Sequence, residues 1–257
     1  MIKAYVADCA CLPEAASDEI RKIYAGVLPD ERIEKICRIR HSEARKQSLC
    51  AGLLLHYVLD RLSPGAQLTY QAFGKPLCAG LAFSLSHTEN AVLVSVWDSQ
   101  DSPTPFSKEA ADFFIGCDIE KIRPYRPHIA RRYFTKSEYD SLESIKNPQE
   151  QAELFSRYWT KKESVLKLTG LGMLLPMDLF DIRSGLVQAD RDQVQAWYEK
   201  QDKERQAQYG QAASMLQERR MYLKEYRYQG CCVTVCALAE RFAADVEIVD
   251  IKRLPDW

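Results

Sequence analysis

The sequence has no long apolar run and no marked excess of charge of either sign. Among its 257 residues, no stretch reaches the roughly 18 consecutive apolar positions that a membrane-spanning helix needs. Residues 1–16 also lack the basic start and apolar core of a secretory signal. We therefore expect a cytoplasmic protein that does not act at a membrane.

The balanced charge also argues against nucleic acid as a partner. A formal net charge of -1 gives no general attraction to a polyanion, so any anion site must come from a local basic cluster. The nine cysteines do not show the C-x2-C spacing of a zinc site, and those within residues 9–11 and 231–236 lie in apolar segments. We expect small buried thiols rather than metal ligands.

Length and composition indicate a globular chain of two parts. A chain of 257 residues exceeds the usual domain size of roughly 100 to 150 residues. Its hydrophobic fraction of 46% and charged fraction of 28% are typical of proteins that bury a core of their own. Residues 98–112 are polar and rich in turn formers, so we place the boundary there and expect domains of residues 1–105 and 106–257.

The first half contains a predicted hairpin and a basic helical region. Residues 81–87 alternate as a strand does and end in Ser86 and His87, and residues 91–97 form a second predicted strand after the turn at 88–90. The pattern leaves open whether His87 is a core histidine with its hydrogen bonds satisfied or a site residue. Acidic neighbours balance the basic region, so its pattern alone indicates a solvated helix face. The basic residues are Arg32, Lys35, Arg38, Arg40, Arg45 and Lys46.

A buried strand in the second half carries two acids on one face. Residues 112–120 end in the run GCDIE, and because strand side chains alternate, Asp118 and Glu120 share a face with Gly116. Two carboxylates so close repel each other unless a cation lies between them, which favours a metal ion or a basic partner. An edge strand with two solvated acids is the alternative.

A long helix follows at residues 148–168, opened by an Asn-Pro pair and closed by a glycine. A four-residue repeat places Phe155, Trp159, Glu163 and Lys167 in one stripe. Because the first two are core-like, Glu163 and Lys167 should point toward the interior. A surface ion pair, which stabilises a helix only weakly, is the alternative.

Five short patches occur together in one order. They are FGKP at 73–76, the strand end at Ser86 and His87, GCDIE at 116–120, FTKSE at 134–138 and WTKKESVLK at 159–167. In these patches the chain resembles the Sfp-type 4'-phosphopantetheinyl transferases, over about residues 1–183. The combination of G-x-D-[IV]-E with W-[TS]-x-K-E-[SA]-x-x-K is highly specific, whereas Gly-Lys-Pro alone is weak.

The resemblance implies a reaction and a set of catalytic groups. These enzymes transfer the 4'-phosphopantetheine arm of coenzyme A to a serine hydroxyl of an apo acyl or peptidyl carrier protein, and release adenosine 3',5'-bisphosphate. Attack on a pyrophosphate phosphorus calls for a hard cation such as Mg2+. By position, the resemblance implies Asp118, Glu120 and Glu163 as metal ligands. Lys167 would stabilise charge on the transferred and leaving phosphates.

The resemblance also places coenzyme A contacts in the first half. This reverses the interpretation of the basic region, because some of its side chains should then face a phosphate. A phosphate would also favour the protonated form of His87. The implied contact residues are Arg32, Lys35, Ser48, Lys75, Ser86 and His87.

The acceptor of the serine proton stays open at this point. Glu163 or a metal-bound water can serve, and Glu138 is the runner-up. Thr135 and Glu138 also have the spacing of a capping box, which would give Glu138 a purely structural role. A non-catalytic module that binds coenzyme A or a carrier protein is the alternative function, but it would not need all three carboxylates.

For the fold, the resemblance implies an α+β protein of two similar subdomains related by a pseudo-twofold axis. Each would be a small, mostly antiparallel sheet packed with helices, with coenzyme A in the cleft between them. A monomer is expected because the duplication already supplies two halves. The linker at 98–114 and the polar segment after Gly185 look longer than in compact members of the family.

Overall fold

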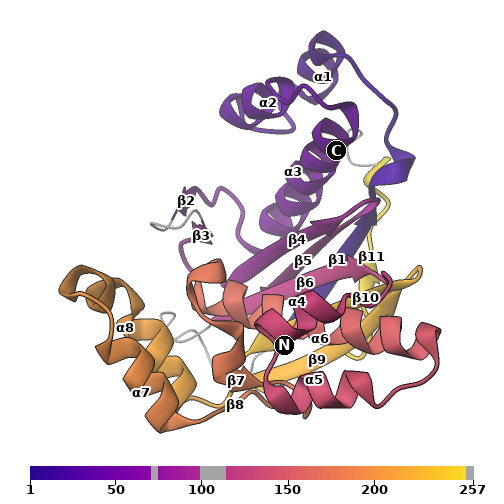
Figure 1. Ribbon diagram of the computed structural model, residues 1–257. Coiled ribbons are helices and arrows are strands. Elements are labelled where there is room, and N and C mark those ends of the chain that lie inside the picture. The colour runs from indigo at the N-terminus through magenta and orange to yellow at the C-terminus, as the bar shows by residue number, and fades with distance from the viewer. Residues whose placement is uncertain (71–74, 99–113, 253–257) are drawn as a thin grey trace.

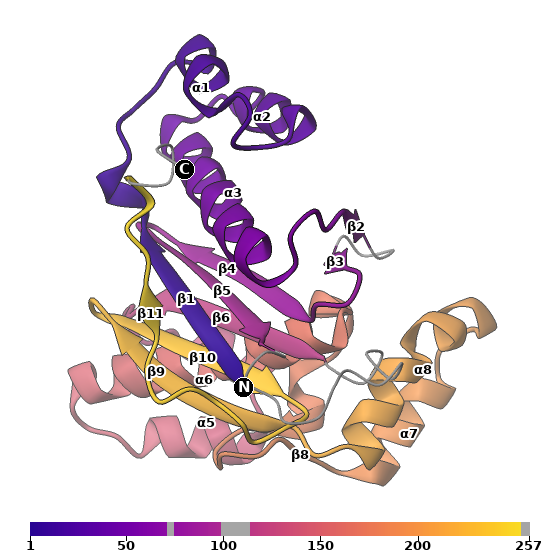
Figure 2. The same ribbon diagram turned by 180° about the vertical axis from the view of Figure 1, so that it is seen from behind.

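The computed structural model describes residues 1–70, 75–98 and 114–252. Within them the chain is an α+β protein of small sheets and α-helices, as predicted (Figures 1 and 2). The first half consists of β1 (Ile2–Asp8), α1 (Ser17–Tyr24), α2 (Asp30–Cys37), α3 (Ser42–Leu62), β2 (Leu68–Tyr70), β3 (Pro76–Cys78), β4 (Phe83–Thr88) and β5 (Ala91–Trp97).

The second half begins with the acidic strand. It consists of β6 (Ile115–Lys121), α4 (Pro127–Tyr133), α5 (Lys136–Glu143), α6 (Pro148–Thr169), β7 (Phe180–Asp181), β8 (Gln188–Ala189), α7 (Arg191–Glu199), α8 (Lys203–Glu218), β9 (Tyr222–Tyr228), β10 (Cys231–Ala237) and β11 (Glu247–Ile248). The polar segment after Gly185 thus forms a helical hairpin, in which the rings of Trp197 and Tyr209 stack with their centroids 5.7 Å apart.

The two halves share one connectivity. In each, a first strand leads to a long helix, and a hairpin then returns so that its second strand pairs with the first strand in antiparallel fashion. The orders are β1-β5-β4 and β6-β10-β9, with α3 and α6 as the long helices. The predicted hairpin of residues 81–87 and 91–97 is confirmed as β4 and β5.

Three buried clusters place these elements in layers. One fills the space between α1, α2, α3 and the first sheet. A second lies between the two sheets and contains Val6, Leu93, Ile119 and Val235. The third packs the second sheet against α4, α5, α6, α7 and α8. The result is a helix–sheet–sheet–helix order, with β4 and β6 near the centre of the molecule (Figure 1).

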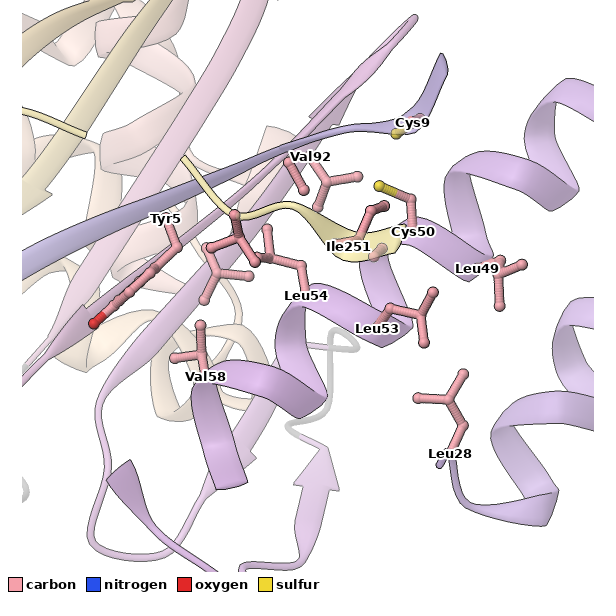
Figure 3. Packing of buried hydrophobic residues seen from close by; sticks show 14 of the residues in the cluster. Tyr5, Cys9, Leu28, Leu49, Cys50, Leu53, Leu54, Val58, Val92 and Ile251 are labelled. Carbon is pink, nitrogen blue, oxygen red and sulfur yellow. The ribbon is translucent and has the colours of Figure 1, made fainter. Parts of the chain in front are cut away.

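The C-terminal segment returns to the first half. Strand β11 pairs in parallel with β1, and the N–H of Val249 donates to the carbonyl of Val6 at 2.8 Å. Ile251 is fully buried among side chains of α3, β1 and β5, as Figure 3 shows. The predicted boundary near residue 105 lies outside the described residues, so the division at 105 and 106 stays a prediction.

The long helix α6 has the ends that its sequence predicts. The side chain of Asn147 accepts hydrogen bonds from the N–H groups of Gln149 and Glu150, and Pro148 occupies the first helical turn. Gly170 ends the helix in the left-handed conformation, at φ 78°. No helix in the described ranges is both long and apolar enough to cross a membrane.

Candidate active site

The acidic strand β6 has the predicted alternation. Ile115, Cys117 and Ile119 are buried in the cluster between the sheets. Gly116 lies on the opposite face, where a Cβ atom would be only 1.8 Å from the carbonyl oxygen of Ser164. The missing side chain therefore lets β6 contact the backbone of α6 directly. This close approach brings Asp118 of the strand to Lys167 of the helix.

Asp118 lies at the centre of a buried polar group and is 4% exposed. Its Oδ1 accepts hydrogen bonds from the Ser86 hydroxyl and the Lys167 Nζ, both at 2.7 Å. The Lys167 Nζ also donates to Ser86 Oγ at 2.8 Å. Burial opposes the charge of Lys167, but the charge and hydrogen bond of the Asp118 carboxylate, with Glu163 adding to them, raise the pKa of that ammonium. Three predicted site residues therefore meet here.

The two other predicted carboxylates, Glu120 and Glu163, interact electrostatically with Asp118 and Lys167. Burial and then the Asp118 carboxylate raise the pKa of Glu163 to about 7, with Glu120 adding to the shift. Burial, followed by Asp118, also raises the pKa of Glu120. Arg123 lies 3.7 Å from Glu120 and partly offsets the repulsion. The site thus concentrates negative charge where little water screens it.

The carboxylates fit a hard cation, although they do not form a finished cage. Among the described residues, no three His, Cys, Asp or Glu side chains are already arranged to hold a metal ion. However, Asp118 Oδ2 is buried and has no hydrogen-bond partner among the residues that the structure describes. An orphaned buried oxygen beside two acids with raised pKa values is the chemistry that Mg2+ satisfies.

Hydroxyl side chains of β4 connect the two sheets. Ser84 Oγ accepts the N–H of Cys117 at 3.1 Å, and Thr88 Oγ1 accepts the N–H of Lys121 at 3.4 Å. Ser86 lies between them and donates to Asp118. These alternate residues share one face of β4, so the edge strands β4 and β6 lie side by side through side-chain bonds.

His87 follows at the exposed end of the same strand. Loss of surrounding water and the Lys167 ammonium lower the pKa of the imidazole, while Asp118 raises it slightly. Without a bound anion His87 is therefore less readily protonated than a free histidine, whereas a phosphate beside it would act in the opposite direction. The adjoining turn contacts α3, because the Gln47 amide donates to the carbonyls of Thr88 and Glu89.

The basic region lies on α2 and at the start of α3. Arg32 donates to the carbonyl oxygen of Ser48 at 2.7 Å and to its hydroxyl at 3.3 Å, so two predicted coenzyme contacts meet each other. Lys35 is exposed on α2. Lys46 forms an ion pair with Glu43. The region therefore combines ion pairs with cations that are open to an anion.

Lys75 has surroundings that its sequence patch did not predict. The Lys75 ammonium donates to three backbone carbonyls, those of Ile115, Lys167 and Leu168. A cavity of about 210 Å³ lies beside it. The cavity is lined by Lys75, Pro76, Phe83, Ser84, Leu85, Leu166, Lys167, Gly170 and Gly172. Phe73 and Gly74 of the FGKP patch lie outside the described residues.

Glu138 is fully buried and its two oxygens have structural partners. Oε2 accepts the N–H of Thr135 at 2.8 Å, which completes the predicted capping box, and lies 2.8 Å from the Lys162 ammonium. Oε1 accepts the N–H of Ile182 at 2.8 Å. Sequence reasoning did not assign Lys162 a role, although it stands in the WTKKESVLK patch. Its partner only appears once α5 packs against α6.

Comparisons with known proteins agree with this geometry. A family model of the 4'-phosphopantetheinyl transferase superfamily matches residues 114–226, which include both β6 and α6. The chain is 32% identical over 174 residues to 4'-phosphopantetheinyl transferase Sfp of Bacillus subtilis, covering 65% of this chain and 71% of that protein. It is 30% identical over 161 residues to 4'-phosphopantetheinyl transferase HetI of Nostoc sp., covering 58% and 62%.

A third relative is 4'-phosphopantetheinyl transferase AcpT of Salmonella typhimurium, which is 31% identical over 159 residues, or 59% of this chain and 71% of the relative. The chain therefore belongs to the 4'-phosphopantetheinyl transferase superfamily. More particularly, it is an enzyme of the 4'-phosphopantetheinyl transferase class.

Proposed function

We propose that this enzyme transfers the 4'-phosphopantetheine arm of coenzyme A to a serine hydroxyl of an apo carrier protein in a Mg2+-dependent reaction. The observation that carries the proposal is the buried contact of Asp118 with Lys167 and Ser86, next to two acids with raised pKa values. The relatives' names support the group that is transferred.

In the transfer, the serine oxygen forms a bond to the β-phosphorus of coenzyme A and the pyrophosphate P–O bond to the nucleotide breaks. Adenosine 3',5'-bisphosphate leaves with the electron pair of that bond. Lys167 is a point charge that can stabilise the developing negative charge, and its raised pKa keeps it protonated. Asp118 and Ser86 fix the direction of its ammonium.

Asp118, Glu120 and Glu163 are the residues that would hold Mg2+. The ion, when bound, neutralises charge on the pyrophosphate oxygens. Glu163 is also the better candidate for the proton acceptor, because it lies close enough to Asp118 and Lys167 for their charges to act on it. Glu138 is the weaker candidate, since contacts with Thr135, Lys162 and Ile182 already use both oxygens.

Coenzyme A would approach from the first half. Arg32, Lys35 and Ser48 offer cationic and hydroxyl groups, and the turn after His87 is tied to α3 next to Ser48. We place the 3'-phosphate among these groups. The remaining partner is an apo acyl or peptidyl carrier protein of fatty acid, polyketide or nonribosomal peptide synthesis. A monomer in the cytoplasm, without membrane or nucleic acid partners, stays our prediction.

The experiment that tests the proposal measures the mass of an apo carrier protein after incubation with enzyme, coenzyme A and Mg2+. The carrier should gain one phosphopantetheine arm, and Asp118→Ala should abolish the gain. Lys200→Met, which changes an exposed lysine at the end of α7, is the control and should leave it intact. Absence of a gain with wild-type enzyme on carriers of all three pathways would refute the proposal.

A second experiment concerns the 3'-phosphate. His87→Ala should raise the KM for coenzyme A by about tenfold, the usual cost of one charged hydrogen bond. The same change should alter the KM for 3'-dephospho-coenzyme A much less, because that analogue lacks the group His87 would contact. Equal effects on the two substrates would remove His87 from the 3'-phosphate site.

A further inference from the structure

Lys75 extends from the first half of the chain to the backbone of the second. It directly precedes β3, in the connection from β2. Its Nζ donates to the carbonyl of Lys167 at 2.6 Å, of Leu168 at 3.1 Å and of Ile115 at 3.2 Å. A lysine ammonium has three N–H donors, so these three carbonyls satisfy all of them.

Two of the three carbonyls belong to the last turn of α6. The final four carbonyls of an α-helix have no partner within the helix. The N–H of Gly170 and the hydroxyl of Thr169 both donate to Leu166, each at 3.0 Å. The Lys75 ammonium donates to the carbonyls of Lys167 and Leu168. At this end of the helix a cation also interacts favourably with the helix dipole. Lys75 therefore caps α6 from outside the helix.

The third carbonyl connects this cap to the acidic strand. Ile115 is the first residue of β6, three positions before Asp118. A single ammonium thus contacts both the helix that carries Lys167 and the strand that carries Asp118. Lys167 is held at two points, since Lys75 contacts its carbonyl while Asp118 and Ser86 contact its Nζ. The distance between the Lys167 ammonium and Asp118 therefore depends on both sets of contacts.

The surroundings of Lys75 indicate a specific role rather than a general ion pair. Within the ranges that the structure describes, no carboxylate pairs with it. Burial lowers the pKa of its ammonium to about 8. A half-buried cation without a carboxylate partner costs stability, so its bonds to α6 and β6 must be strong enough to hold it there.

We propose that Lys75 is a positioning residue, which holds the last turn of α6 against β6 so that Lys167 meets Asp118. The inference rests on the proposed function and differs from the coenzyme contact that the sequence resemblance implies for Lys75. The two roles affect different constants. A residue that positions a catalytic group changes kcat, whereas a residue that only binds coenzyme A changes KM.

The kinetic test uses Lys75→Met, which keeps most of the unbranched side chain but removes its donors, and Lys75→Arg, which restores donors. We expect Lys75→Met to lower kcat by about tenfold to a hundredfold, as small displacements of catalytic groups do. Its KM for coenzyme A should change less than about twofold, and Lys75→Arg should recover most of kcat. A rise in KM that exceeds the fall in kcat would overturn the proposal, and so would an unchanged kcat.

A second measurement does not depend on activity. Amide hydrogen exchange of residues 168–174 should become faster in Lys75→Met than in the wild type or in Lys200→Met, because the end of α6 loses its cap. Unchanged exchange there would overturn the proposal. If the wild type transferred nothing to any carrier, the proposed function would fail, but this measurement would still decide whether Lys75 holds α6.

Discussion

Glu163 has a charge state that depends strongly on the fold. Burial, Asp118 and Glu120 raise its pKa to about 7, while Lys167 acts in the opposite direction. In an unfolded chain, where water surrounds the carboxylate, a glutamic acid has a pKa of about 4.3. The folded enzyme therefore binds a proton at Glu163 more tightly than the unfolded chain does.

This difference makes stability depend on pH. In metal-free enzyme, the contribution of Glu163 to the free energy of unfolding is fully present below about pH 4 and is lost as pH rises through about 7. The loss has an upper limit of about 4 kcal/mol, from the difference between an unfolded pKa of about 4.3 and the folded pKa of about 7. Urea unfolding at pH 5 and pH 8 measures it. Glu163→Gln should reduce the difference between the two pH values, and an equal difference in both proteins would contradict the assignment.

Glu138 and Lys162 form a pair that is 0% exposed on both side chains. Burial lowers the pKa of the Lys162 ammonium, and the Glu138 carboxylate compensates. Two carbonyls, of Met177 and Phe180, also accept from Lys162. The pair therefore joins α5, α6 and the segment that follows α6.

Removing one partner should therefore be costly. We expect Lys162→Met to destabilise the enzyme by about 3 to 5 kcal/mol, because it leaves a buried carboxylate unpaired. The double variant with Glu138→Gln should recover a large part of this loss in a urea unfolding experiment. If Glu138 were the base instead, Glu138→Gln would abolish transfer with little change in stability.

For single residues, the sequence predicted which side chains form the site better than it predicted the contacts that they make. The patches around Asp118 and Lys167 were enough to bring these two residues together in the interpretation, and the structure places them 2.7 Å apart. For Glu138, the capping box of Thr135 was also visible in the sequence. The partners of Lys75 were not visible, because they are backbone carbonyls of distant segments, which no residue type reveals. The pairing of Lys162 with Glu138 was not visible either, because it forms only when α5 packs against α6.

Among the elements, α6 and β6 form the closest contact that bears on the site. At Gly116 a Cβ atom would lie 1.8 Å from Ser164 O and 2.4 Å from Leu168 N. Both of these atoms belong to the helix backbone, which cannot rotate away as a flexible side chain can. The position therefore tolerates only glycine while α6 stays in place.

Gly116→Ala should displace α6 and separate Lys167 from Asp118. We expect a destabilisation of at least about 2 kcal/mol and a large loss of transfer, since overpacking of this kind forces the backbone to move. Gly210→Ala in α8 is the matched control, because its Cβ would meet only Tyr198 at 3.5 Å. Alanine in a helix interior should stabilise by up to about 1 kcal/mol. Thermal unfolding of both variants compares them, and equal effects would contradict this account.

Local signals predicted the elements well where they were strong. The caps of α6, the hairpin of β4 and β5 and the alternation of β6 all follow from side chains near in sequence. The lateral contact of β4 with β6 could not be predicted in this way. It joins residues more than 30 positions apart through Ser84, Ser86 and Thr88, which in sequence look like ordinary polar positions of a strand.

At the scale of the whole molecule, the end of the described chain returns from the second half to the first. After β10 it returns to place β11 beside β1 and Ile251 in the core of the first half. The resemblance implied the repeated subdomains but did not indicate that the C-terminal segment pairs with the first half. In that segment, single apolar residues alternate with charged ones, and such a pattern does not predict a core contact. The C-terminal segment thus stabilises the half that we expect to bind the nucleotide.

Ile251 and Ile248 provide a matched pair for this segment. Ile251 is 0% exposed, whereas Ile248 is 66% exposed. Ile251→Ala should destabilise the enzyme by about 2 to 5 kcal/mol, through lost burial and a cavity. Ile248→Ala should change stability by less than about 0.5 kcal/mol. Denaturant midpoints of the two variants give the comparison, and similar midpoints would show that the tail does not support the core.

The lateral contact of β4 with β6 also bears on self-association. An open strand edge is a template on which a second molecule can extend the sheet. Here each of the two edges covers the other through the hydroxyls of Ser84, Ser86 and Thr88, of which Ser86 also donates to Asp118. Another copy could reach either edge only after the halves had separated. That separation would also remove Ser86 from Asp118, so molecules competent to aggregate through these edges would already have lost the assembled site.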